Sequence, residues 1–279
     1  MAGMSSLIRL SGIVSGCALF GAVLMFPVVA GAVSLASHKA IYDIRLVSSK
    51  NGSQVLDVRG KMLYVIKKSC DGYISDHKFN LNYEYSGSPP VQVETKFTSF
   101  EGLDGKVLNF SSNRLSNGEA DQELRGKAHV SSGDAKNAAV YSIPDDLSFD
   151  LDSTTLFPAA HTSHLIDAAM QGKKLFKATV FDGSDDKGPV DINAVIGKKI
   201  GVDDKSKLDK TLTGVSGWSM RLAVFPKQGD DQDISDYEMT MELLENGVVK
   251  NMRVDYHDFS VSQKLVAIEP VKAEECGVE

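Results

Sequence analysis

The sequence predicts a mainly β protein, built on one large antiparallel sheet that curls into an incompletely closed barrel, a β-spiral. Three observations support this class. Asn-Gly and Asp-Gly pairs recur along the chain and are typical of tight hairpin turns. The segments between them alternate apolar and polar residues, as half-buried strands do. Roughly a dozen or more strands are expected, and so many rarely stay open and flat. A two-sheet sandwich is the alternative.

The turns and strands can be assigned in order along the chain. The turn pairs are Asn51-Gly52, Asp71-Gly72, Asp104-Gly105, Asn117-Gly118, Asp182-Gly183 and Asn246-Gly247. The clearest period-two alternation lies at residues 40–46, 55–59, 91–94, 218–224 and 239–243. Glycine and asparagine tolerate the positive φ angles that tight hairpins need, so each pair is expected to reverse the chain.

Residues 1–32 have the pattern of a cleavable signal peptide. Arg9 is the only charged side chain before Lys39, and an apolar run follows it over residues 10–29. The run ends in Ala30-Gly31-Ala32, the small-x-small pattern that a signal peptidase reads. We expect cleavage after about Ala32, a periplasmic location and a mature protein that does not span the membrane.

Two other roles for this segment remain as alternatives. About 20 apolar residues are long enough to span a bilayer, although glycines and Pro27 interrupt the run and no Lys/Arg cluster flanks it. A lipoprotein signal would use Cys17, which follows a small-residue box. However, the longest apolar stretch comes after Cys17, where a lipoprotein would already be mature.

Residues 33–279 are expected to form a single domain. No Pro- or Ser-rich linker divides them and no repeat of fixed period is visible. The whole chain carries a net charge of −7, and removal of Arg9 with the signal gives about −8. An acidic chain disfavours binding to nucleic acid through bulk charge. We expect a monomer without a cofactor.

Cysteine positions indicate one disulfide. Cys17 leaves with the signal, so Cys70 and Cys276 remain in a compartment where thiols oxidise. The simplest inference is that they pair and attach the C-terminal tail to an early part of the sheet. The alternative is two free thiols or a redox site, but there is no C-x-x-C spacing.

One segment breaks the strand pattern and is expected to be the main α-helix, near residues 158–171. Pro158 suits a helix start, and Gly172 suits a stop. His161, His164 and Asp167 follow at spacings of three, so they could share one face and offer metal ligands. We interpret them as edge residues of a buried stripe, with a metal site as the alternative.

Two other motifs resemble a metal-binding loop and a catalytic turn but do not match them. Residues 182–188 alternate oxygen donors like a calcium loop, but Lys187 stands where the bend glycine of an EF-hand belongs. Residues 214–218 begin like a nucleophile elbow, but Trp218 replaces the closing glycine and a strand follows. Trp218 is interpreted as a core residue, with a place in a ligand cleft as the alternative. No catalytic residue is predicted.

Taken together, these segments resemble the EipB family of alphaproteobacterial cell-envelope integrity proteins, from His38 to Cys276. The residues that carry the resemblance are at 37–46, 60–64, 70–73, 157–158, 165–169, 181–186, 194–197, 216–218, 244–248 and 255–260, together with Cys276. The resemblance implies a periplasmic β-spiral with one helix and a disulfide between Cys70 and Cys276. It also implies a role in envelope integrity under stress, without known enzymatic activity.

Two functional hypotheses follow. In the first, the protein is a non-enzymatic envelope factor that binds a protein partner, or a lipid or peptide ligand, through the open side of its barrel. In the second, it is a metal-dependent or other hydrolase that acts on envelope components through the helix histidines. Replacement of His161 and His164 would separate the two hypotheses, because only the enzyme needs them for function.

Overall fold

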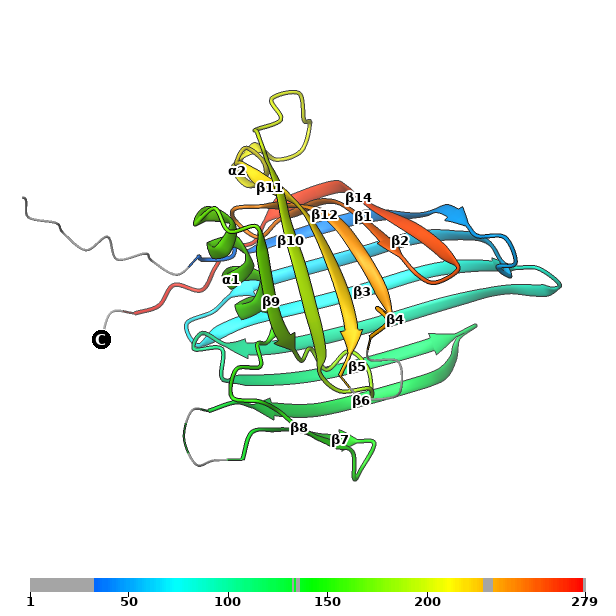
Figure 1. The fold of residues 1–279 in the computed structure, drawn as a ribbon, viewed down its shortest axis with the longest axis horizontal. Helices are drawn as coiled ribbons and strands as arrows, with labels where there is room; N and C mark the ends of the chain where they lie inside the picture. The colour runs from blue at the N-terminus through cyan, green and yellow to red at the C-terminus, as the bar shows by residue number, and fades with distance from the viewer. Residues whose placement is uncertain (1–32, 132, 134–135, 228–232, 278–279) are drawn as a thin grey trace, which may run out of the picture. The chain divides into compact units, whose positions relative to one another are not determined.

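A computed structural model describes residues 33–131, 133, 136–227 and 233–277. The predicted signal peptide, residues 1–32, lies outside this part of the chain. The described residues form a 14-stranded sheet in which every pair of neighbouring strands is antiparallel. The mainly β class and the single curled antiparallel sheet are therefore confirmed (Figure 1).

The strands follow one another in the sheet almost as they do in the sequence. Their order is β8-β7-β6-β5-β4-β3-β2-β1-β14-β13-β12-β11-β10-β9. Their bounds are β1 His38–Ser49, β2 Val55–Lys68, β3 Gly72–Tyr85, β4 Ser88–Gly102, β5 Val107–Ser116, β6 Glu119–His129, β7 Ala138–Ile143, β8 Ser148–Asp150, β9 Leu175–Val180, β10 Val190–Ile200, β11 Gly217–Pro226, β12 Tyr237–Leu244, β13 Val249–Asp255 and β14 Phe259–Pro270.

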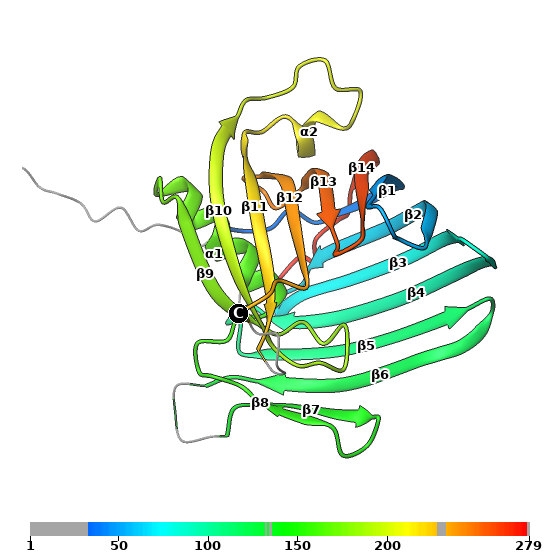
Figure 2. The same cartoon turned by 45° about the vertical axis from the view of Figure 1, so that its right-hand side comes forward.

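The sheet curls but does not close into a barrel. Its outermost strands, β8 and β9, are not paired with each other. Beside β9, Leu156 forms an isolated parallel bridge with Val180. Its N–H donates to the Thr179 carbonyl over 2.9 Å. Figures 1 and 2 show β9 to β12 crossing steeply over β3 to β6, so the two ends of the sheet overlap as in a spiral.

The overlap is held by aromatic packing. Phe181, directly after β9, packs edge-on against Phe110 of β5, with the ring centroids 5.6 Å apart. Tyr141 of β7 joins them, 5.0 Å from Phe110. Gly183 lies on the Phe110 ring with φ +70°, and a Cβ there would come within 2.4 Å of that ring. Glycine at 183 therefore allows the loop from β9 to β10 to lie against β5.

The predicted helix is confirmed as α1, Pro158–Met170. It buries Leu165 and Ile166 against the inward side chains of β10 and β11, such as Ala194 and Met220. These four side chains are all 3% exposed or less. The sequence did not predict the second, short helix α2, Lys210–Thr213, whose N-terminus is capped by Asp209. One face of the β9–β11 region is thus closed by α1.

The predicted turns mostly have the expected backbone. Gly52, Gly105, Gly118, Gly183 and Gly247 all have positive φ. Gly183 lies in a longer loop and not in a tight hairpin. Gly72 is different, because it begins β3 and is needed for space: a Cβ there would lie 2.2 Å from the Glu101 carbonyl oxygen. The Asp71-Gly72 pair therefore marks a close approach of strands.

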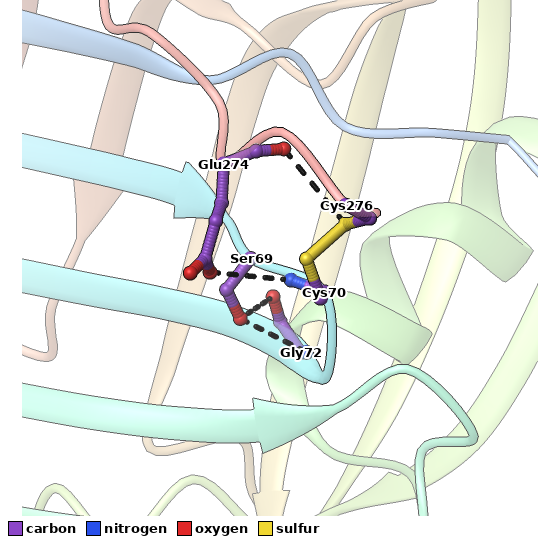
Figure 3. The surroundings of a disulfide bond; sticks show 5 residues. All are labelled: Ser69, Cys70, Gly72, Glu274 and Cys276. Atoms are coloured by element: carbon purple, nitrogen blue, oxygen red, sulfur yellow. Dashed lines mark hydrogen bonds between the residues drawn. A yellow bond between two sulfur atoms is a disulfide. The ribbon is translucent and has the colours of Figure 1, made fainter. Parts of the chain in front are cut away.

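A disulfide joins Cys70, in the turn before β3, to Cys276 in the C-terminal tail, with a Cα–Cα distance of 5.5 Å and a sequence separation of 206 (Figure 3). The tail also makes backbone contacts with the sheet. The Glu274 N–H donates to the Lys68 carbonyl over 3.3 Å, and the Glu274 carboxylate accepts from the Cys70 N–H over 3.4 Å. The tail is thus attached to the β2–β3 turn.

Candidate functional site

The second half of β3 carries a row of apolar side chains on its inward side. Phe79, Leu81, Tyr83 and Tyr85 alternate with Asn80, Asn82 and Glu84, so the period-two pattern gives this strand one apolar face. All four apolar side chains are only half-buried, although they pack against a buried cluster that includes Val58 and Met62 of β2. The rings of Tyr83 and Tyr85 stack, with centroids 6.0 Å apart.

A second group of aromatic side chains comes from the other half of the sheet. Tyr237 begins β12, Tyr256 lies in the turn after β13, and Phe259 begins β14. The Tyr256 ring is 5.9 Å from Tyr237 and stacks on Phe259 at 4.9 Å. Tyr256 is 38% exposed, so an aromatic surface remains open to solvent there.

Both groups pack against the same buried cluster, which includes side chains of β2, β1, β14 and β13. These four strands separate β3 from β12 in the sheet. Burial, followed by the neighbouring Tyr256 and Tyr85, raises the pKa of Tyr83 to about 12. We call Tyr83, Tyr85, Tyr237, Tyr256 and Phe259 the aromatic face. Uncharged phenols and rings of this kind bind apolar groups and also offer hydroxyl hydrogen bonds.

An acidic hollow of about 460 Å³ adjoins the aromatic face at Tyr237. Four aspartates and one lysine line it together with the apolar Val224: Asp182, Asp185, Asp186, Asp236 and Lys187. Burial raises the pKa of Asp185, and the neighbouring Asp182 acts in the same direction. Asp182 and Asp185 each accept a 2.9 Å bond from a backbone N–H two residues ahead, so their carboxylates also shape the loop. A negative ligand group would be repelled here.

The helix histidines do not form one site. His161 is 8% exposed and lies 5.8 Å from the Phe176 ring, and burial, with His164 nearby, lowers its pKa to about 4. His164 is exposed and lines a different hollow, while Asp167 is half-buried. Among the described residues, no three His, Cys, Asp or Glu side chains are grouped as metal ligands. The helical spacing alone did not bring these three together.

Trp218 is not part of the aromatic face. It is 7% exposed and belongs to the buried cluster under α1, with the Lys199 ammonium 5.7 Å from the centre of its ring. The interpretation as a core residue fits this position better than a place in a ligand cleft.

A buried carboxylate links the sheet to α1. Glu101 of β4 is 4% exposed and accepts hydrogen bonds from the N–H groups of Ala159 and Ala160, at 2.6 and 2.7 Å. It satisfies two of the free N–H groups at the helix start. Burial raises the pKa of Glu101 to about 7, although both hydrogen bonds act against this rise. Glu101 positions α1.

Sequence reasoning missed the aromatic face and Glu101. The aromatic face could have been suspected from β3 alone, because large apolar residues occupy every second position at its end. They are Phe79, Leu81, Tyr83 and Tyr85. Tyr237, Tyr256 and Phe259 carried no signal that linked them to β3, because the cluster that Tyr237 and Phe259 share with β3 depends on tertiary packing. Glu101 could have been noticed as the one charged residue among the inward positions 97, 99 and 101.

The fold and the aromatic face define a class: a curled antiparallel sheet closed on one side by a helix, with an apolar surface half-open inside. Comparison with known proteins is more specific. Residues 29–272 match the family model described as EipB-like, and the chain belongs to this family. The curated "Cell envelope integrity protein EipB" of Brucella abortus (strain 2308) is 30% identical over 271 residues, which cover 94% of each chain.

A solved structure supports the fold. The "Beta-barrel-like Protein of Domain of Unknown Function DUF1849" from Brucella abortus superposes with a TM-score of 0.80 at 30% identity, covering 86% of this chain and 100% of that one. Across the part of the chain that the structure describes, no helix has the length and apolar character needed to cross a membrane.

Proposed function

We propose that this protein is a non-enzymatic factor of the cell envelope that maintains envelope integrity by binding an apolar envelope component on its aromatic face. The observation that carries the proposal is that Tyr83, Tyr85, Tyr237 and Phe259 all pack against one buried cluster and yet stay half-buried. Monomeric proteins rarely leave contiguous apolar surface open without a binding role. The name of the Brucella abortus relative supports the envelope role.

The proposal includes a periplasmic location and a single mature domain over residues 33–279. The apolar run and the Ala30-Gly31-Ala32 pattern support export. The disulfide between Cys70 and Cys276 supports an oxidising compartment, because thiols stay reduced in the cytosol.

The acidic hollow restricts the ligand. A molecule whose apolar part lies on Tyr237 would place its polar end near Asp182, Asp185 and Asp236. Uncharged or cationic polar ends fit this surrounding, while anionic ends are disfavoured. We therefore expect lipids or apolar peptides that lack a negative end group to bind best.

The experiment uses N-phenyl-1-naphthylamine, an uncharged apolar fluorophore, with protein purified from cells that express the full-length gene. Wild type should enhance its fluorescence, and the double variant Tyr83→Ser, Tyr256→Ser should bind at least about tenfold more weakly. Ile74→Ser is the matched control, because Ile74 is an apolar side chain of β3 that is 37% exposed, close to the 38% of Tyr256. Equal binding by the double variant and wild type would contradict the proposal.

The hydrolase hypothesis is tested separately. His161→Ala would open a cavity in the core, so the informative variant is His164→Ala, whose side chain is exposed. We expect cells that carry His164→Ala to keep normal resistance to envelope stress such as detergent. Loss of resistance with unchanged protein level, or stoichiometric metal in protein purified without a His-tag, would favour the enzyme.

A further inference from the structure

The outermost strand β9 leaves one edge of the sheet open. Phe176 pairs with Ala194 of β10, and Ala178 pairs with Ile192. In an antiparallel ladder, successive residues direct their N–H and C=O groups to opposite sides. The carbonyl of Lys174 accepts from the Ile196 N–H over 2.8 Å, so the even-numbered residues of β9 face β10. The backbone groups of Leu175, Lys177 and Thr179 therefore point away from β10.

Leu156 already pairs with this edge of β9 at one point. The Leu156 N–H donates to the outward carbonyl of Thr179 over 2.9 Å, and the Phe181 N–H donates to the Leu156 carbonyl over 3.0 Å. After this single bridge the chain turns into α1 at Pro158. Among the described residues, no hydrogen bond reaches the backbone groups of Leu175 or Lys177 from the side away from β10.

A hollow of about 660 Å³ borders this edge and continues over β10 and β11, where Asp191, Asn193 and Phe225 line it. Phe176, Lys177 and Thr179 line its β9 side. Its other walls include Thr154, Leu156 and His164, which belong to the segment before α1 and to α1 itself. The hollow therefore opens on the backbone groups of β9 that point away from β10.

We propose that the free edge of β9 binds an extended peptide as an added strand. Open ladder groups at a sheet edge are the usual means by which a protein captures a peptide in this way. The side chains of β9 define which peptide fits. Phe176 and Ala178 lie on the inward side, whereas Lys177 and Thr179 lie on the outward side with Asp191. A peptide that alternates apolar and polar residues would match both sides.

This site is separate from the aromatic face. Its residues lie on β9, on α1 and before α1, whereas the aromatic face belongs to β3, β12, β14 and the turn before β14. Peptide binding at β9 therefore does not depend on the fluorophore site, and an experiment can contradict either proposal without contradicting the other.

The test uses a fluorescein-labelled peptide that alternates valine and threonine over six residues, which is long enough to pair with the free groups of Leu175 and Lys177. Its binding to protein from the full-length gene is measured by fluorescence anisotropy. Lys177→Pro removes an N–H that points into the hollow and leaves the β9–β10 ladder intact, because edge strands tolerate proline on the open side. We expect at least about tenfold weaker binding by Lys177→Pro and a change of less than about twofold by Lys177→Ala. Equal binding by wild type and Lys177→Pro would overturn the proposal, as would no binding by wild type.

A second measurement leaves the protein unchanged and so cannot fail through misfolding. Two versions of the peptide are N-methylated, one at every valine and the other at every threonine. An added strand uses donors on one side only, so one version should bind and the other should not. Equal affinity of both versions would show that no strand is added. Dimerisation of wild type that Lys177→Pro abolishes, measured by analytical ultracentrifugation, would also overturn the proposal, because the edge would then pair with a second copy.

Discussion

Two regions of the same sheet have similar alternating sequences but different outcomes. Under α1, the inward side chains of β10 and β11 are closed off, and Ala194 and Met220 are 2% and 1% exposed. Near the end of β3 and at the start of β12, the inward side chains Tyr83 and Tyr237 stay half-buried, although Tyr237 also packs against the cluster under α1. The comparison shows that alternation determines which face of a strand is apolar, whereas the covering element determines whether that face becomes core or open surface.

The largest effect is expected in the region covered by α1. Ile166 is 0% exposed in the helix, so Ile166→Ala removes buried methyl groups and leaves a cavity. We expect a loss of about 2–5 kcal/mol in the free energy of unfolding, measured by urea denaturation. A loss below about 1 kcal/mol would show that α1 packs loosely and that the two regions do not differ as described.

The disulfide should have the next largest effect. Cys70 precedes β3 at the end where Tyr73 packs against the cluster under α1, so the disulfide fixes the covered region. Cys70→Ser and Cys276→Ser should each lower the free energy of unfolding by about 2–4 kcal/mol. The double variant should match either single variant in thermal denaturation. Additive losses would mean that the two cysteines act independently.

Removal of the Glu101 carboxylate should have a smaller effect on the same region. Glu101→Ala leaves the N–H groups of Ala159 and Ala160 without their acceptor. We expect a loss of about 1–3 kcal/mol, again measured by urea denaturation. Glu84→Ala, on the outward side of β3 at the aromatic end, serves as a control: it removes an exposed ion pair with Arg59 and should change stability by less than about 1 kcal/mol. Equal losses in both variants would contradict the role of Glu101 at α1.

Glu101 also predicts a pH dependence. Its pKa is raised from 4.5 to about 7 in the folded protein, so the folded state holds the proton more tightly than the unfolded state. This contribution to stability is complete below about pH 4.5 and is lost as the pH rises through about 7. Between these values, the melting temperature of wild type should fall relative to that of Glu101→Gln, which cannot titrate. Parallel curves for the two proteins would exclude an ionising role of this carboxyl.

The smallest effect on stability is expected in the aromatic face. Tyr256 is 38% exposed, so Tyr256→Ala should change the free energy of unfolding by less than about 1 kcal/mol in urea denaturation. The same substitution should still weaken binding of N-phenyl-1-naphthylamine. A large loss of stability without a change in binding would reverse the comparison and make Tyr256 a structural residue.

The sequence by itself determined the strands, the turns and the helix, because these depend on local periodicity and on glycine at positive φ. Alternation over residues 218–224 predicted the inward side of β11, and Pro158 with Gly172 bounded α1 closely. The two cysteines of the predicted mature chain made their pairing the simplest inference.

Only the tertiary structure decided what the inward faces do. The packing of Tyr83 and Tyr237 against one buried cluster, the support of α1 by Glu101 and the burial of His161 all depend on tertiary contacts. Each depends on how far the sheet curls and on where α1 lies against it. Local sequence patterns carry no information about the distance between two strands that are separated by four others in a sheet, so these contacts could not be predicted from periodicity or spacing.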